Sequence, residues 1–310
     1  VSGKVLNQLL VQLAPDASLK PLLKRAHQLG LSSVKPRRTV ARRLKIHLLE
    51  FDLAQTSEAE LAGWLEQQPE VLLQQPNYRL DFRSPPNDPE YDQQWGPERI
   101  GLTDVWPDGK GGVTANGDTI VIAILDSGFD LSHEDLAGNI WVNPHEVPGD
   151  GLDNDNNGYV DDMNGWDFRS DSPEIAYDDH GLQVSGVLAA KGNNDRGIAG
   201  VCWDAKVLFM SIQYIDHIIS AYEYVIDQRR RYNETLGAEG AFVVATNASF
   251  GLTDPFFCSE YPIWGNMYDL MGEEGILTGA GTANKDRDID RVGDMPTSCE
   301  SDFIMTVLNS

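Results

Sequence analysis

The chain has 310 residues, 41% hydrophobic and 23% charged, which is enough for one large and one small domain. No stretch approaches the run of about 20 apolar residues that a membrane-spanning helix needs. The net charge of −24 is uneven: residues 1–85 hold 12 basic and 8 acidic side chains, whereas residues 86–310 hold 12 and 40. This acidity argues against nucleic acid as a partner and favours cations, although solubility alone would also explain it. The opposite charges favour docking of the two parts.

Residues 1–77 are predicted to form a small α+β domain. Strands are expected at residues 7–13, at 43–51 and from 71 on, and helices at residues 19–29 and 61–68. Ser57 and Glu60 have the spacing of a capping box before the second helix, and Gly30 and Pro69 end the two helices. The resulting order β-α-β(β)-α-β is typical of a ferredoxin-like fold.

Residues 78–94 are rich in proline and lack an apolar period, which predicts a linker. In residues 95–310, apolar runs alternate with helical patterns. Strands are expected at 119–125, 206–212, 241–249 and 275–281, and helices from His180, at 220–233 and at 264–272. Such a βαβ series predicts an α/β fold with a doubly wound, mainly parallel sheet.

This topology predicts that two polar residues lie on the same side of the sheet. Asp126 ends the apolar run TIVIAIL, so it lies at the carboxyl edge of a buried strand, where α/β proteins place ligands and chemistry. His180 opens a helix of small and aliphatic residues. An aspartate at a strand end followed by a histidine at a helix start is the order found in subtilisin.

Four segments resemble the motifs of subtilisin-like serine proteases. They are VIAILDSGFDLSHEDL at residue 121, HGLQVSGVLAAKGNNDRGIAGV at residue 180, NASFG at residues 247–251 and GILTGAGTAN at residues 275–284. The resemblance implies a subtilisin-like fold and a serine endopeptidase that hydrolyses peptide bonds with an Asp-His-Ser triad. Asp126 would orient His180 as the general base, and Asn284 would contribute to the oxyanion hole. Polypeptide substrate would bind at the backbone of Ser249, Phe250 and Gly251 and in a pocket lined by Gly281 and Thr282.

The resemblance extends to the organisation of the chain. Residues 1–77 are similar to the inhibitory propeptide of a zymogen, and residues 95–310 are similar to the N-terminal part of the catalytic domain. A processing site is expected between about Tyr78 and Asn87, because an exposed, extended segment fits a protease cleft. The family also implies a secreted or cell-surface location. An unrelated small α+β domain is the alternative for the first part.

The family's nucleophile motif, Gly-Thr-Ser-x-Ala-x-Pro, does not occur in these 310 residues. Ser298 follows Pro296-Thr297 without the rest of the motif, so we interpret it as a loop residue. We therefore expect the 310-residue chain to be inactive alone and the nucleophilic serine to lie outside it, in the same polypeptide or in a separate C-terminal chain. The alternatives are a non-catalytic scaffold derived from a protease half and one chain of a split protease.

One acidic loop has the alternate spacing of a calcium site. Its expected ligands are Asp153, Asp155, Asn157, Tyr159 and Asp161, with Gly158 at the turn and Asn164 in place of the usual final glutamate. The alternative is an acidic loop that binds nothing. By resemblance to the family, Asp135 and Asn194 form a weaker second calcium site.

The three cysteines do not make a disulfide framework. Cys258 and Cys299 both lie in loop-like sequence and are expected to pair if the protein is outside the cytosol. Cys202 lies in an apolar run and is expected to be a buried free thiol.

Overall fold

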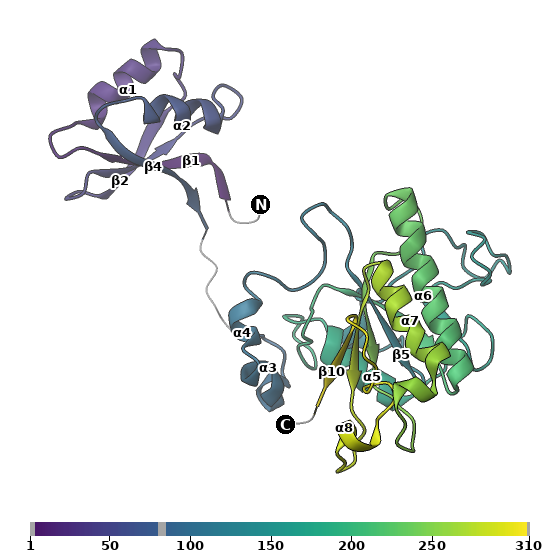
Figure 1. The fold of residues 1–310 in the computed structure, drawn as a ribbon. Helices are drawn as coiled ribbons and strands as arrows, with labels where there is room; N and C mark the ends of the chain where they lie inside the picture. The colour runs from purple at the N-terminus through teal and green to yellow at the C-terminus, as the bar shows by residue number, and fades with distance from the viewer. Residues whose placement is uncertain (1–3, 80–84, 309–310) are drawn as a thin grey trace. The chain divides into compact units, whose positions relative to one another are not determined.

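The computed structural model describes residues 4–79 and 85–308. The chain divides into two compact units, residues 1–82 (unit 1) and residues 83–310 (unit 2), which are treated separately below (Figure 1). None of the helices in the described residues is both long and apolar enough to cross a membrane.

Unit 1 is a four-stranded antiparallel sheet in the order β2-β3-β1-β4 with two helices. Its elements are β1 (Lys4–Leu13), α1 (Leu19–Gln28), β2 (Lys35–Ala41), β3 (Ile46–Glu50), α2 (Glu58–Glu66) and β4 (Val71–Tyr78). Leu9 and Val11 of β1 pack with Leu22 of α1 and Leu61 of α2, so both helices cover the same core. The Ser57 Oγ accepts the Glu60 backbone N–H at 3.2 Å, which is the expected cap of α2.

The strand prediction at residues 43–51 needs a correction. β3 begins only at Ile46, after a turn that contains Lys45 at φ 49°, and a separate strand, β2, precedes it. β2 has the sequence KPRRTVA and is almost entirely exposed at the sheet edge, so it lacks the apolar alternation that reveals a strand.

The linker prediction at residues 78–94 also needs a correction. Residues 85–94 belong to unit 2 and are bonded to it. The buried Asp88 carboxylate accepts the backbone N–H groups of Asn193 and Asn194 at 2.8 and 3.1 Å. Tyr91 is buried with its ring 6.0 Å from that of Trp106. The predicted processing interval lies partly outside the described residues, which resume at Pro85.

Unit 2 is built on a six-stranded sheet in the order β10-β9-β8-β5-β7-β6, with every neighbouring pair parallel. The strands are β5 (Val121–Asp126), β6 (Gly165–Asp167), β7 (Lys206–Ser211), β8 (Val243–Ala248), β9 (Leu277–Gly281) and β10 (Ile304–Val307). The helices are α3 (Trp95–Arg99), α4 (Leu102–Val105), α5 (Asp179–Ala189), α6 (Ile215–Thr235), α7 (Pro262–Glu273) and α8 (Ile289–Val292). Short 3-10 turns are η1 (Tyr91–Gln93), η2 (Glu134–Leu136) and η3 (Cys258–Glu260).

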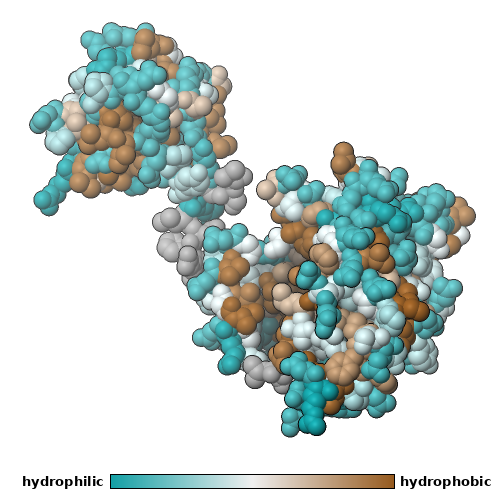
Figure 2. Space-filling model, viewed as in Figure 1, coloured by the Kyte–Doolittle hydropathy of each residue, from teal (hydrophilic) through white to brown (hydrophobic). Residues whose placement is uncertain are grey.

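Both faces of this sheet are covered, as alternate residues of β5 show. Ala123 and Leu125 belong to the core formed with α6 and α7, whereas Ile124 packs in a second core with residues of α5. Figure 2 shows mainly hydrophilic residues over the exposed side of α6, as expected for a helix that buries only one face. The predicted doubly wound parallel sheet is confirmed, and the carboxyl ends of β5, β8 and β9 meet at one edge.

Candidate active site

Asp126 and His180 meet at the carboxyl edge of the sheet. Asp126 is the last residue of β5, and His180 lies in the first turn of α5, where its backbone N–H is capped by the Asp178 carboxylate at 2.8 Å. The His180 Nδ1 lies 2.7 and 2.9 Å from the two Asp126 carboxylate oxygens, so Nδ1–H donates to them. The His180 Nε2 makes no hydrogen bond within the described residues. It is left available, on a side chain that is 56% exposed.

The neighbouring residue, Ser127, also binds the Asp126 carboxylate, at the oxygen that lies 2.7 Å from His180 Nδ1. This oxygen accepts the Ser127 backbone N–H at 2.7 Å and the Ser127 hydroxyl at 3.1 Å. Asp126 is only 4% exposed, so these bonds and the imidazole compensate for burying its charge. The arrangement orients a histidine for proton transfer.

The glycines in both motifs allow this close approach of strand and helix. A Cβ on Gly181 would lie 2.0 Å from the Gly128 carbonyl oxygen and 2.9 Å from the Phe129 ring. Gly128 itself has φ 157°, and a Cβ there would lie 2.5 Å from the Ala176 carbonyl oxygen. A larger residue at position 181 would push α5 away from the end of β5, and one at position 128 would displace the segment that leads into α5.

The predicted substrate residues line one cleft beside His180. This cleft has a volume of about 410 Å³. Its lining includes His180, Ser249, Phe250, Gly251, Gly281, Thr282 and Asn284. The structure therefore brings together the candidate base, both candidate binding segments and the candidate oxyanion donor, although they are far apart in sequence.

A second hollow of about 540 Å³ shares His180 and the Ser249–Leu252 segment with the first, and Asp126 and Ser127 line this second hollow alone. Its remaining lining comes from the end of β7, the start of α6, and α7: Ile212, Gln213, Tyr214, Ile215, Ile218 and Trp264. Sequence reasoning missed these residues, because apolar side chains at element ends look the same whether they face a core or a cleft. Ser298 lines neither hollow; its hydroxyl donates to the Phe256 carbonyl and accepts the Cys258 N–H, as expected for a loop residue.

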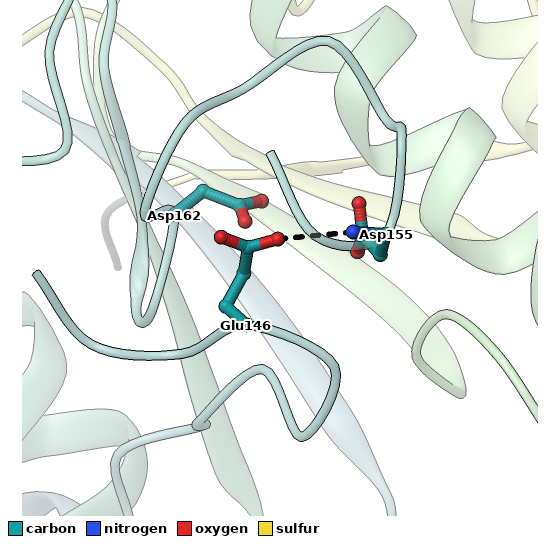
Figure 3. Close-up of side chains that lie close together, drawn as sticks. All are labelled: Glu146, Asp155 and Asp162. Carbon is teal, nitrogen blue, oxygen red and sulfur yellow. Dashed lines mark hydrogen bonds between the residues drawn. The ribbon is translucent and has the colours of Figure 1, made fainter. Parts of the chain in front are cut away.

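Three carboxylates gather at the predicted calcium loop, but they are not the predicted set. Glu146, Asp155 and Asp162 each place an oxygen within 4.8 Å of the others (Figure 3). Asp155 is shared with the prediction. The sequence analysis missed Glu146 and Asp162. Two signals were available: Asp162 directly follows the predicted ligand Asp161, and Glu146 is an acidic residue in the segment before the loop.

The other predicted ligands are used differently. Asp153 accepts the backbone N–H groups of Asn157 and Gly158 at 3.0 and 2.9 Å, and the Asp161 carboxylate accepts those of Gly149 and Gly151. The side-chain amide oxygen of Asn157 accepts the Tyr159 backbone N–H. These bonds shape the loop, so its alternate acidic spacing reflects turn formation as much as convergence on an ion.

The nearby cation, Arg231, donates to the Asp155 backbone carbonyl at 2.9 Å and not to the carboxylates of the acidic cluster. Within the described part of the chain, Glu146, Asp155 and Asp162 form no ion pair with a basic side chain. Burial raises the pKa of the Asp162 carboxyl to about 6, against the hydrogen bonds from Tyr224, Asn157 and Asn143 that lower it. Carboxylate oxygens that lie close together without a direct ion pair are a donor set that suits a hard divalent cation. This cluster could hold a metal ion.

At the second predicted site, Asp135 and Asn194 are in contact. The Asn194 amide donates to one Asp135 oxygen at 3.0 Å, and the Ile198 backbone N–H donates to the other at 2.8 Å. Asp135 is buried, and no further acidic group joins it in a cluster of three or more among the described residues.

The expected pairing of Cys258 and Cys299 is present as a disulfide. It joins the start of η3 to the segment that follows α8, 41 residues later. Cys202 is a free, half-buried thiol whose pKa is raised by burial.

Comparison with known proteins places this site in a family. A model described as the subtilase family matches residues 117–287, more than half of the chain. Subtilisin-like protease 1 of Plasmodium berghei is 34% identical over 153 residues, which cover 46% of this chain and 25% of that protein. The extracellular basic protease of Dichelobacter nodosus is 31% identical over 172 residues, 51% of this chain and 28% of that protein.

Among solved structures, the epidermin leader peptide processing serine protease of Staphylococcus aureus aligns with a TM-score of 0.48 and 15% identity, over 97% of this chain and 68% of its own. The chain spans about a quarter of the length of the two curated relatives. The family match includes Asp126, His180 and Asn284. The chain therefore belongs to the subtilase family.

Proposed function

We propose that this chain carries the general base of a serine endopeptidase whose nucleophilic serine lies outside the 310 residues. The main support is one juxtaposition: the Asp126–His180 hydrogen bond, at 2.7 Å, opens onto the cleft that Asn284 also lines. Polypeptide is the substrate class that follows.

The reaction uses the two nitrogens of His180 differently. Because Nδ1–H donates to Asp126, the Nε2 lone pair can accept the serine hydroxyl proton while the serine oxygen attacks the peptide carbonyl carbon. The imidazolium then gives this proton to the leaving amine, and a water molecule repeats the sequence to release the acyl group. Asp126 remains ionised and stabilises the imidazolium. The Asn284 amide donates to the oxyanion, which is worth about 10²- to 10³-fold in rate for a donor of this kind.

Substrate binding would use both walls of the cleft. An extended peptide can pair with the backbone of Ser249, Phe250 and Gly251 as an added strand. Gly281 and Thr282 would line the pocket for the residue before the scissile bond. Unit 1 would be the inhibitory propeptide of the zymogen, which is supported by its compact fold, its net positive charge and its place before the catalytic residues.

The acidic cluster would bind calcium. Glu146, Asp155 and Asp162 would hold the ion, which would neutralise their charge and stabilise the loop around them. Asp135 and Asn194 remain a weaker candidate for a second ion. The Cys258–Cys299 disulfide and the extracellular relative both support a location outside the cytosol.

An active-site-directed fluorophosphonate probe tests the endopeptidase. The full-length protein is first freed of unit 1 by cleavage and then treated with the probe in the presence of calcium. The probe should label one serine covalently. His180→Ala should abolish labelling, whereas His133→Ala, at an exposed histidine outside the cleft, should not. If the folded wild-type protein is not labelled, the endopeptidase proposal fails, and a non-catalytic scaffold is favoured. Sequencing beyond Ser310 for Gly-Thr-Ser-x-Ala-x-Pro gives an independent answer.

A further inference from the structure

A buried carboxylate lies behind the cleft, outside the Asp126–His180 pair. Asp294 is only 2% exposed, although it is neither a motif residue nor part of the acidic cluster. One of its oxygens accepts the Ala283 backbone N–H at 3.1 Å and the Thr297 hydroxyl at 2.6 Å. Burying a carboxylate is unfavourable unless it is hydrogen-bonded, so these two bonds are what allows Asp294 to be buried here.

The bond to Ala283 closes the loop that carries the candidate oxyanion donor. β9 ends at Gly281, Asn284 follows Ala283 directly, and the chain returns through α8 to Asp294. Asp294 thus fixes the backbone one residue before Asn284. Since Asn284 is itself exposed, this anchor limits where its amide can point.

The same short segment also supports the opposite wall of the cleft. The Met295 carbonyl oxygen accepts the Leu252 N–H at 3.1 Å, and a Cβ on Gly251 would lie 2.6 Å from that oxygen. Asp294 and Met295 therefore connect the oxyanion loop with the substrate-binding segment. The spacing between the two walls depends on this connection.

The charge around Asp294 agrees with an anchoring role. The Arg287 guanidinium, from the same loop, lies 3.9 Å from the free Asp294 oxygen. Its Nη1 is buried and has no hydrogen-bond partner in the described residues, so the carboxylate is its nearest compensating charge. Loss of the Asp294 carboxylate would leave the Arg287 cation unpaired. It would also free the loop at two residues, Ala283 and Arg287.

We propose that Asp294 is a positioning residue that holds Asn284 in place for oxyanion stabilisation. The inference rests on the proposed endopeptidase function. Asp294 is buried and is not among the residues that line the cleft, so in this proposal it acts through the Ala283 N–H and the loop that follows.

Kinetics of the full-length protease test this role, with active sites counted by the fluorophosphonate probe. Asp294→Ala should lower kcat about 10- to 100-fold with KM little changed, since misplacing a catalytic group by about 1 Å costs about 10²-fold. Asp294→Asn keeps an acceptor for the Ala283 N–H and should retain kcat within about threefold. In an Asn284→Gly background, Asp294→Ala should cause no further loss, because the group it positions is gone.

Two kinetic results would overturn the proposal. One is a full further loss in the Asn284→Gly background, which means that Asp294 acts independently of the oxyanion donor. The other is a change confined to KM or to the preferred residue before the scissile bond, which means that Asp294 shapes the pocket instead.

Hydrogen exchange gives a readout that does not depend on proteolysis. Asp294→Ala should speed amide exchange in residues 282–285 at least tenfold and leave β5 unchanged. Asp118→Ala removes a carboxylate of similar bonding at the opposite end of β5, where it accepts the Thr114 and Tyr232 hydroxyls, and should not affect residues 282–285. If the protein proves not to be a protease, unchanged exchange in these residues still refutes the anchor.

Discussion

Asp162 offers a test of the acidic cluster because its charge is unfavourable in the metal-free protein. Its pKa is raised to about 6 in the folded state, from an ordinary value of 3.8. Between these values the folded state holds a proton that the unfolded state has lost, so stability falls as pH rises through this window and is level above it. The full loss is on the order of 3 kcal/mol.

Asp162→Asn removes the negative charge of this side chain and keeps nearly the same side-chain shape. The amide loses one acceptor toward the Tyr224, Asn157 and Asn143 donors, at a cost of about 1 kcal/mol. We therefore expect the variant to be about 2 kcal/mol more stable than the wild type at pH 7.5 in chelator, and slightly less stable at pH 4. Calcium should stabilise the wild type at pH 7.5, but not the variant.

Urea unfolding followed by tryptophan fluorescence measures this, because six of the seven tryptophans lie in unit 2. Asp153→Asn is the matched control: its carboxylate belongs to the predicted loop but not to the observed cluster, so the calcium response should persist. The reasoning is refuted if calcium stabilises Asp162→Asn as much as the wild type, or if Asp153→Asn alone removes the response.

Substitutions at a helix cap, at the cysteines and at a tightly packed glycine test the fold that supports the site. Ser57→Ala removes the α2 cap and should cost about 1 kcal/mol, seen as roughly fivefold faster amide exchange in α2. Replacing Cys258 and Cys299 by serine should destabilise unit 2 by up to about 4 kcal/mol in urea, given their separation of 41 residues, whereas Cys202→Ser should change little. Gly181→Ala should lower the melting temperature and shift the His180 ring resonances, because a Cβ there meets the Gly128 carbonyl; an unchanged spectrum would contradict the packing argument.

Much of the parallel sheet could be predicted, because its strands are buried on both faces. The run before Asp126 reads as a strand from its apolar character alone, and the structure places it at the centre of the sheet. The meeting of Asp126 and His180 followed from topology: parallel strands end at one edge, and a helix that starts there brings its first turn to the same point.

What the sequence left open depends on contacts between distant residues. The predicted order β-α-β(β)-α-β allowed a further strand, but the position of β2 escaped prediction because an exposed edge strand has no apolar period. The acidic loop was predicted from spacing, but which carboxylates converge depends on how the loop folds, and this fold brings Glu146 from the preceding segment close to Asp155 and Asp162. Asp294 gives no local signal, since its partner, Ala283, lies 11 residues earlier.

These contacts connect the parts of the candidate site to one another. The Asp126 carboxylate is satisfied by Ser127 and His180, and the cleft walls are joined through Asp294 and Met295, all within the described residues. The candidate base, its carboxylate partner and the loop that carries Asn284 are therefore held in place by bonds within unit 2, and the exposed His180 side chain leaves its Nε2 open to a reacting group.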